Sequence, residues 1–170
     1  MGKNIEIRNL TERDCEIISK SFSTQGWNKP TSQYQDYLAE SKQGKRVVLV
    51  AEKDSTFAGY ITIIWESYNE SFRLSNIPEI VDLNVLKKYQ RQGIGQLLLN
   101  EAEKIISTRS KIAGIGFGIT PDYGPAHILY IKSGYIPNGQ GICRNGLSIK
   151  YGDTIRVDDT LAIYLIKKLN

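Results

Sequence analysis

The chain has few of the side chains that metal sites and covalent catalysis require, since its 170 residues include two cysteines and one histidine. Cys15 and Cys143 lie far apart and form no C-x-x-C motif. Together with His127 they offer one ligand fewer than a structural zinc site takes. No G-x-S-x-G motif accompanies His127, which argues against a serine hydrolase. We therefore expect no metal, two buried or inert thiols and a histidine on the surface.

Long apolar runs are also missing from the sequence. The most apolar stretches, residues 47–51 and 61–65, have the length of strands. A helix that spans a membrane needs about 18 apolar residues in a row. Residues 1–6 show no apolar signal-peptide segment. We therefore expect a cytoplasmic protein that has no membrane partner.

Neither sign of charge is in large excess, because 22 Lys and Arg against 18 Asp and Glu leave a formal net charge of +4. Hydrophobic residues make up 41% and charged residues 24%, which is typical of a globular domain rather than a disordered chain. At this length one domain over residues 1–170 is expected. The charges are dispersed, so we expect no nucleic-acid partner, although a basic nucleic-acid binder stays open as an alternative.

The spacing of apolar residues predicts a mixed α/β fold. Alternating or continuous apolar patterns predict seven strands, which cover residues 5–10, 46–53, 56–66, 79–85 and 112–119, a run that begins at residue 135, and residues 160–167. The second and third of these strands are expected to form a hairpin with its turn at residues 53–55. Helical spacing predicts helices that begin near Thr11 and cover residues 32–42, 94–106 and 125–133. The Thr11 hydroxyl is expected to accept a hydrogen bond from an early N–H group of the first helix. Residues 67–76 are expected to form a loop, and residues 139–153 show no assignable pattern.

A basic, glycine-containing turn at residues 87–95 follows the 79–85 strand and leads into a helix. Glycines here allow positive φ and a close approach of the backbone to a ligand. The N–H groups of such a turn and of the helix N-terminus suit a pyrophosphate, and Lys87, Lys88 and Arg91 add positive charge. The chain has no Walker A motif, and a leucine takes the third glycine position of a dinucleotide-binding fingerprint. By itself the turn is equally compatible with a surface loop that binds nothing.

Two motifs resemble those of the GNAT superfamily of N-acetyltransferases. Residues 90–95 (Q-x-x-G-x-G), preceded by L-x-V at 83–85 and followed by an amphipathic helix, resemble the acetyl-CoA motif of that family. Residues 126–135 (A-x-x-L-Y-x-x-x-G-Y) resemble its second motif. The predicted order of elements is similar to the GNAT fold from residue 5 to about 137 and again in the last strand.

The resemblance implies a mixed, mainly antiparallel sheet with a splayed parallel central pair and helices on both faces. It implies acetyl-CoA as the acetyl donor, no metal, and direct transfer to an unidentified primary amine in a ternary complex. An alternative function, an acyl-CoA sensor or scaffold of the same fold, stays open. A homodimer is also possible as the oligomeric state. The family pattern implies that the backbone of Leu83 and Val85 pairs with pantetheine, and that the pyrophosphate is wrapped by Gln90, Arg91, Gln92, Gly93, Ile94 and Gly95.

The resemblance also implies that Tyr130 is the general acid, because a phenol beside the sulfur can donate a proton to the leaving thiolate. The general base is open, with Asp82, Glu79 and Glu66 as candidates near the expected acceptor cleft. Asp82 lies on the strand face opposite Leu83, so a hydrogen-bonded pair or a solvent-facing carboxylate is an alternative for it. Aromatic side chains expected near the acceptor are Trp27, Tyr34 and Tyr37.

Three glycines alternate along the 112–119 strand, at Gly114, Gly116 and Gly118. They are predicted to leave room where a thin ligand enters between two parallel strands, and a weakened edge strand is the alternative. Tyr123 stands where the second motif commonly carries an asparagine that bonds pantetheine, so this contact is not carried over. Residues 139–159 could cover the acceptor site or a dimer contact.

Overall fold

The computed structural model describes residues 4–170. Backbone contacts divide them into two compact units. The first holds the described residues up to Ile64 together with Asp82–Ala102, and the second holds Trp65–Val81 and Glu103–Asn170. The division falls inside strand β4 (Glu79–Val85) and helix α4 (Ile94–Ser107), so each unit contains part of both elements. The single domain expected from the sequence stays a prediction.

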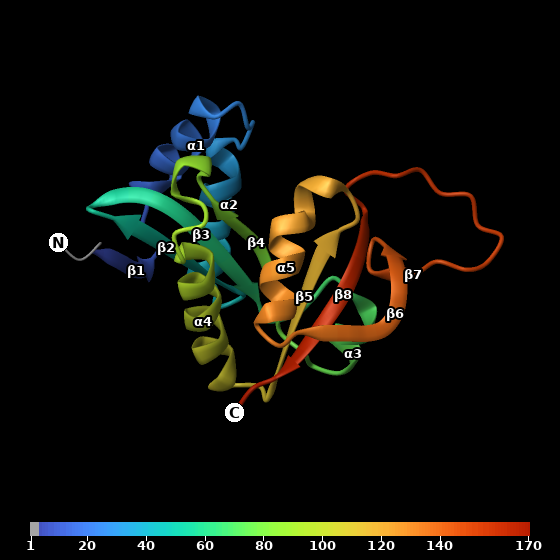
Figure 1. The fold of residues 1–170 in the computed structure, drawn as a ribbon. Helices are drawn as coiled ribbons and strands as arrows, with labels where there is room; N and C mark the ends of the chain where they lie inside the picture. The colour runs from blue at the N-terminus through green and yellow to red at the C-terminus, as the bar shows by residue number, and fades with distance from the viewer. Residues whose placement is uncertain (1–3) are drawn as a thin grey trace. The chain divides into compact units, whose positions relative to one another are not determined.

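The first unit is built on a run of antiparallel strands. Its further elements are β1 (Ile5–Asn9), α1 (Asp14–Thr24), α2 (Thr31–Lys42), β2 (Arg46–Lys53), β3 (Thr56–Ile64) and the short 3-10 helix η1 (Lys87–Tyr89). β1 pairs with β2 and β2 with β3, both antiparallel, and β3 neighbours β4 (Figure 1). Helix α2 packs against β2, and α1 packs against β3.

The hairpin between β2 and β3 confirms the turn predicted at residues 53–55. Lys53 pairs with Thr56, which leaves Asp54 and Ser55 as a two-residue loop. Both loop residues have positive φ, 50° and 61°. Two left-handed residues are what a type I′ turn requires, and this turn matches the twist of the strands that it joins.

Helix α1 begins in a different way from the prediction. The Thr11 N–H and hydroxyl both donate to Asp14 Oδ2, at 2.7 Å each. Arg8 donates to the two oxygens of the same carboxylate at 2.7 and 2.8 Å. Burial raises the pKa of Asp14, but the hydrogen bonds from Arg8 and Thr11 outweigh it and the net pKa is lowered. The prediction for Thr11 is therefore wrong, because its hydroxyl donates to Asp14 instead of accepting from the helix.

The core of the first unit is aromatic. Phe22 is fully buried, stacks on Trp27 with ring centroids 5.6 Å apart, and meets the rings of Phe57 and Tyr60 edge-on at 5.9 Å. Cys15 lies in the same cluster. Burial raises the pKa of this thiol and also that of Cys143 in the second unit, so the expectation of buried thiols is confirmed.

The second unit contains the one parallel pair among the strand pairings described. Its further elements are α3 (Glu70–Leu74), β5 (Ile112–Gly118), the 3-10 helix η2 (Pro121–Tyr123), α5 (Gly124–Lys132), β6 (Ile136–Arg144), β7 (Leu147–Ser148) and β8 (Leu161–Lys168). β4 runs parallel to β5, while β8 lies antiparallel between β5 and β6 (Figure 1). The predicted mixed, mainly antiparallel α/β fold is therefore confirmed.

Helix α3 occupies a segment predicted to be a loop. The Asn69 side chain accepts a hydrogen bond from the Phe72 N–H at 3.0 Å, and so caps the helix at its N-terminus. Phe72 is buried and meets the Tyr164 ring edge-on at 5.5 Å. A single capped turn with one buried ring leaves little periodicity in the sequence, which is why the helix was not predicted.

Strand β6 explains why the glycine-rich segment after residue 138 showed no pattern. Gly139 and Gly141 have positive φ, 90° and 66°, and the pairing of β6 with β8 shifts register between Pro137 and Ile142. Such a bulge interrupts the alternation by which a strand is identified. β6 then continues to Arg144, so the strand is longer than predicted.

The alternating glycines of β5 make room for aromatic rings of the chain itself. A Cβ atom at Gly114 would lie 2.4 Å from the Phe72 ring, one at Gly116 2.9 Å from the Tyr164 ring, and one at Gly118 2.4 Å from the Tyr123 ring. Contacts this short are not tolerated. The glycines therefore accommodate rings on this face of β5, and room for a ligand between the parallel strands β4 and β5 stays a prediction. β5 lies between β4 and β8 and so is not an edge strand, and its pairing with β4 involves Gly114 and Ile115.

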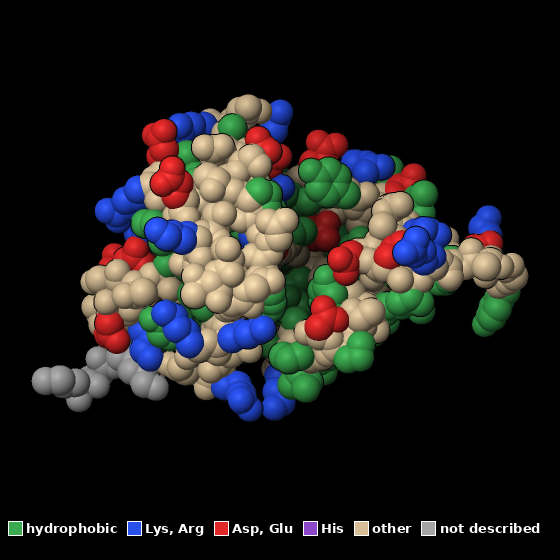
Figure 2. All heavy atoms as spheres, turned by 90° about the horizontal axis from the view of Figure 1, so that it is seen from above, with side chains coloured by type: hydrophobic (Ala, Val, Ile, Leu, Met, Phe, Trp, Pro, Cys, Tyr) green, Lys and Arg blue, Asp and Glu red, His purple; other side chains and the backbone are tan. Residues whose placement is uncertain are grey.

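Charged side chains of both signs lie on the surface of the protein. Figure 2 shows basic and acidic side chains interspersed over the visible face instead of gathered into one basic surface. Among residues 4–170 no helix has the length and apolarity needed to cross a membrane. The same residues contain no group of three or more His, Cys, Asp and Glu side chains placed to hold a metal ion.

Candidate functional site

The turn of residues 90–95 joins η1 to α4 in the first unit. Arg91 has φ 56° and Gly93 φ 86°, so two residues in the left-handed conformation are separated by a single residue. Both are exposed. Backbone of this kind turns successive N–H groups toward one side, and the first N–H groups of a 14-residue helix follow directly. A turn of this kind next to a helix N-terminus can form an anion-binding site.

Side-chain amides hold the turn in place. Gln90 Nε2 donates to the Val85 carbonyl at 3.1 Å, and Gln92 Nε2 donates to the Lys88 carbonyl at 3.0 Å. Lys53 Nζ donates to Gln92 Oε1 at 2.5 Å. Because these side-chain amides bond to the protein itself, and the Gln90 N–H donates to the Lys87 carbonyl at 3.3 Å, Gln92 would serve a ligand through its main-chain N–H group.

The basic residues before the turn lie over aromatic rings. Lys87 Nζ is 5.5 Å from the centre of the Trp27 ring, and Lys88 Nζ is 4.8 Å from that of Tyr89. Both lysines are exposed and border a cavity of about 290 Å³. Both lysines precede the turn directly in sequence, and their role beside a phosphate stays a prediction.

The C-terminal half of β4 approaches β3 very closely. A Cβ atom at Gly59 would lie 2.6 Å from the Asn84 carbonyl oxygen, so only glycine fits at this position. Asp82 has φ 54°, a left-handed conformation inside a strand. A non-glycine residue adopts this conformation at a cost, and such residues are concentrated at bulges and functional sites. Leu83 and Val85 follow directly and are half-buried.

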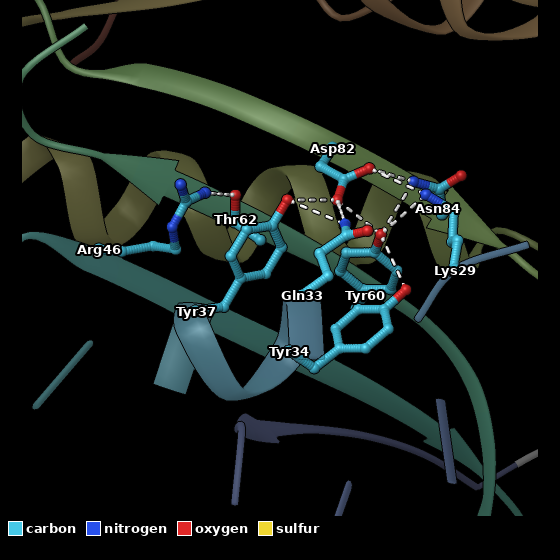
Figure 3. Close-up of polar contacts among 9 residues, drawn as sticks. All are labelled: Lys29, Gln33, Tyr34, Tyr37, Arg46, Tyr60, Thr62, Asp82 and Asn84. Atoms are coloured by element: carbon cyan, nitrogen blue, oxygen red, sulfur yellow. Dashed lines mark hydrogen bonds and ion pairs between the residues drawn. The ribbon is translucent and has the colours of Figure 1, made fainter. Parts of the chain in front are cut away.

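The carboxylate of Asp82 is the centre of a polar cluster in the first unit (Figure 3). Its Oδ2 atom accepts hydrogen bonds from the Tyr60 hydroxyl at 2.6 Å, the Tyr37 hydroxyl at 2.9 Å and Gln33 Nε2 at 3.1 Å. Burial, and after it the charge of Asp82, raises the pKa of both tyrosines, so both phenols remain protonated and donate.

The other oxygen of the same carboxylate is also occupied. Asn84 Nδ2 donates to Asp82 Oδ1 at 2.7 Å, and Lys29 Nζ lies 3.4 Å from it. With five donors around it, this carboxylate has few lone-pair directions left for a proton from a substrate. Of the aromatic residues expected near the acceptor, Tyr37 contacts Asp82, whereas Tyr34 is buried and Trp27 stacks on Phe22.

Glu79 is the buried carboxyl group of the second unit. It is 6% exposed, and the Ser67 hydroxyl donates to its Oε2 atom. Burial raises its pKa, the hydrogen bond from Ser67 lowers it by less, and the net result is a pKa of about 7. A carboxyl group that titrates near neutrality can take up and release a proton under physiological conditions. Glu66, the third carboxylate candidate, is exposed.

Tyr130 lies on α5 of the second unit and is 5% exposed. Its ring centre is 6.2 Å from that of Tyr135. His127 is exposed on the same helix and stacks on Phe117 at 4.2 Å, so the expectation of a surface histidine is confirmed. Of the predicted site residues, the first unit therefore holds the turn, Leu83, Val85 and Asp82, and the second holds Glu79 and Tyr130.

A comparison with protein families decides the relationship. The model of the acetyltransferase (GNAT) domain matches residues 44–137, which is more than half of the chain. The chain belongs to the GNAT acetyltransferase family. A search of curated proteins found no match.

Solved structures share the GNAT fold with this chain over almost its whole length. Ribosomal-protein-alanine N-acetyltransferase from Brucella melitensis is 20% identical, with a TM-score of 0.70 and coverage of 96% of this chain and 99% of that one. A structure of yncA from Salmonella typhimurium with its cofactor acetyl-CoA is 18% identical, with a TM-score of 0.70 and coverage of 98% and 94%. PaiA N-acetyltransferase from Thermoplasma acidophilum, in complex with coenzyme A, is 20% identical, with a TM-score of 0.65 and coverage of 97% and 99%. At these identities the likeness shows the fold alone.

The GNAT motifs did not reveal every polar residue around the candidate positions. Lys29, Gln33 and Tyr60 bind Asp82 from segments 22 to 53 residues away in sequence. Tyr60 lies within an apolar strand, and Lys29 in a segment with no pattern of its own. These residues meet Asp82 only through the packing of distant segments in the folded protein. No local pattern in the sequence could therefore have identified them.

Proposed function

We propose that the protein is an N-acetyltransferase that moves an acetyl group from acetyl-CoA to a primary amine by direct transfer. The observation that carries this proposal is the turn of residues 90–95, where two left-handed residues precede the N-terminus of α4. Its exposed backbone, its bracing amides and the neighbouring lysines fit a diphosphate. The bound structures of GNAT relatives support coenzyme A as the molecule that carries it.

In this proposal the main chain of Gln90–Gly95 binds the diphosphate, and the backbone of Leu83 and Val85 orients the pantetheine arm. Arg91 and Gly93 provide the positive φ of the turn, and Ile94, whose side chain is buried, is proposed to contribute its N–H group. Acetyl-CoA supplies an activated acetyl thioester when it is bound. Arg91 is exposed beside the turn and adds positive charge.

Two residues of the second unit are proposed to move protons. Glu79 accepts a proton from the acceptor amine, because its pKa of about 7 lets it be a carboxylate at neutral pH and still a useful base. Tyr130 donates a proton from its phenol to the thiolate that leaves. Asp82 is the less favoured base, since both of its oxygens already accept hydrogen bonds.

The transfer reaction is tested by release of free coenzyme A thiol from acetyl-CoA with a panel of primary amines. The proposal predicts amine-dependent thiol release, with product mass increased by one acetyl group. A protein that binds coenzyme A but acetylates no amine would instead be the acyl-CoA sensor or scaffold. A cytoplasmic location stays a prediction of the sequence, and a homodimer stays open.

A further inference from the structure

The ammonium group of Lys29 points toward Asp82 and Tyr60 (Figure 3). Its Nζ atom is 3.4 Å from Asp82 Oδ1 and 3.2 Å from the Tyr60 hydroxyl oxygen. It also lies over the Phe22 ring at 5.6 Å and the Tyr60 ring at 5.8 Å from the ring centres. A carboxylate, a phenol and two aromatic faces are the groups by which proteins recognise alkylammonium ions. We call this place, formed by Phe22, Tyr60 and Asp82, the ammonium seat.

The ammonium seat needs a positive charge. The other groups that donate to Asp82 are neutral, namely two phenols and two amides, and neutral donors solvate a carboxylate without cancelling its charge. The Asp82 side chain is 20% exposed, so the charge is largely withdrawn from water. A partly buried carboxylate is costly without a cation. If Lys29 leaves, another cation is therefore favoured in its place.

Lys29 is held loosely enough to be exchanged. Its two polar contacts, 3.2 and 3.4 Å, are longer than the about 2.7–2.9 Å of a strong charge-assisted hydrogen bond. Its side chain is 19% exposed, so it has a route to solvent. It also lies in the segment without regular structure between α1 and α2. Asp82, in contrast, is fixed by four further donors and keeps its position when Lys29 moves.

We propose that the ammonium seat, occupied by Lys29 in the free protein, binds the non-reacting ammonium of a linear aliphatic diamine that is the acetyl acceptor. This inference rests on the proposed acetyltransferase function. An ammonium paired with Asp82 is held in its protonated form, and a protonated nitrogen has no lone pair with which to attack a thioester. The nitrogen in the seat is thus the anchor, and the amine at the other end of the alkyl chain is acetylated.

Binding to the seat is measured without acetyl-CoA, so that it does not depend on catalysis. Trp27 stacks on Phe22, which borders the seat, and its fluorescence in a Trp65→Phe background reports a titration with 1,4-diaminobutane. Lys29→Ala removes the competing ammonium and is expected to tighten binding about fivefold, the effect of one partly exposed ion pair. Asp82→Asn is expected to weaken binding about tenfold. Lys45→Met, at an exposed lysine before β2, is the matched control and leaves the affinity unchanged.

A Lys29→Gln variant guards against a loss of folding in Lys29→Ala, and denaturation curves of all variants accompany the titrations. Equal affinity of the wild type and both Lys29 variants would overturn the exchange of Lys29. Equal affinity of the wild type and Asp82→Asn would overturn the seat itself. Neither outcome depends on acetyl transfer.

The anchoring role is measured by turnover of 1,4-diaminobutane and of n-butylamine, which has one amine. The inference predicts a kcat/KM about tenfold higher for the diamine than for n-butylamine, because the KM of the diamine is lower. This preference should be lost in Asp82→Asn. Equal kcat/KM for the two amines would overturn the anchoring role while leaving the acetyltransferase function intact. Absence of turnover with every amine would refute the proposed function, and the fluorescence titration would then still decide whether the seat exists.

Discussion

Burial of Glu79 makes the stability of the protein depend on pH. The group is 6% exposed and its pKa is raised from 4.5 to about 7, chiefly by burial. Below pH 4.5 the carboxyl is protonated in both the folded and the unfolded state. Between pH 4.5 and about 7 the folded state keeps the proton while the unfolded state releases it. The free energy of unfolding therefore falls as the pH rises through this window.

The size of the effect follows from the width of the window. The pKa of Glu79 is about 2.5 higher in the folded than in the unfolded state, and a difference of one corresponds to about 1.4 kcal/mol, so the total loss is about 3.5 kcal/mol. It is complete above about pH 7, where both states are ionised. A glutamine at position 79 does not titrate, so Glu79→Gln is expected to remove this part of the pH dependence.

Urea denaturation at half-unit steps from pH 4.5 to 8 measures this prediction. The difference in unfolding free energy between wild type and Glu79→Gln should change by about 3 kcal/mol across the series, in favour of the variant at high pH. Glu66→Gln, at an exposed carboxylate that follows β3, is the control and should follow the wild type. Parallel curves for wild type and Glu79→Gln would refute the raised pKa and with it the argument for Glu79 as a base.

Other substitutions test single features. Gly114→Ala would place a Cβ 2.4 Å from the Phe72 ring and should destabilise the protein by about 1–3 kcal/mol. Part of this loss should be recovered when Gly114→Ala is combined with Phe72→Leu. Equal melting temperatures of the wild type and Gly114→Ala would contradict the close packing. Tyr130→Phe should lower kcat about a hundredfold with little change in the KM for acetyl-CoA, and full turnover in steady-state assays would remove the proposed acid. Asp14→Asn breaks the bonds from Arg8 and should cost about 2 kcal/mol at pH 7. Because the pKa of Asp14 is lowered, this cost should decrease as the pH falls below 3.8, and a cost that stays constant with falling pH in urea denaturation would contradict it.

Local patterns in the sequence predicted the elements whose structure is set locally. The β2–β3 hairpin follows from two residues that tolerate positive φ, and the turn of residues 90–95 from its glycines and the helix after it. The GNAT motifs placed Tyr130 on a helix and the acetyl-CoA motif after β4, and both placements hold in the structure.

Features that depend on packing between distant segments were beyond the sequence. The glycines of β5 are explained by rings that arrive from α3, η2 and β8. The contact of Lys29 with Asp82 joins residues 53 positions apart. The pKa of Glu79 depends on how completely the fold removes it from water, which the alternating pattern of β4 does not disclose.

The turn of residues 90–95 is tested most directly by isothermal titration calorimetry with coenzyme A, with 3′-dephospho-coenzyme A, and with pantetheine, which lacks the diphosphate. Binding of the diphosphate by the main chain predicts a one-site heat signal for coenzyme A, with most of the affinity kept by the dephospho form. It predicts binding of pantetheine weaker by about a hundredfold. No heat with coenzyme A, or equal affinity for coenzyme A and pantetheine, would contradict the role of this turn.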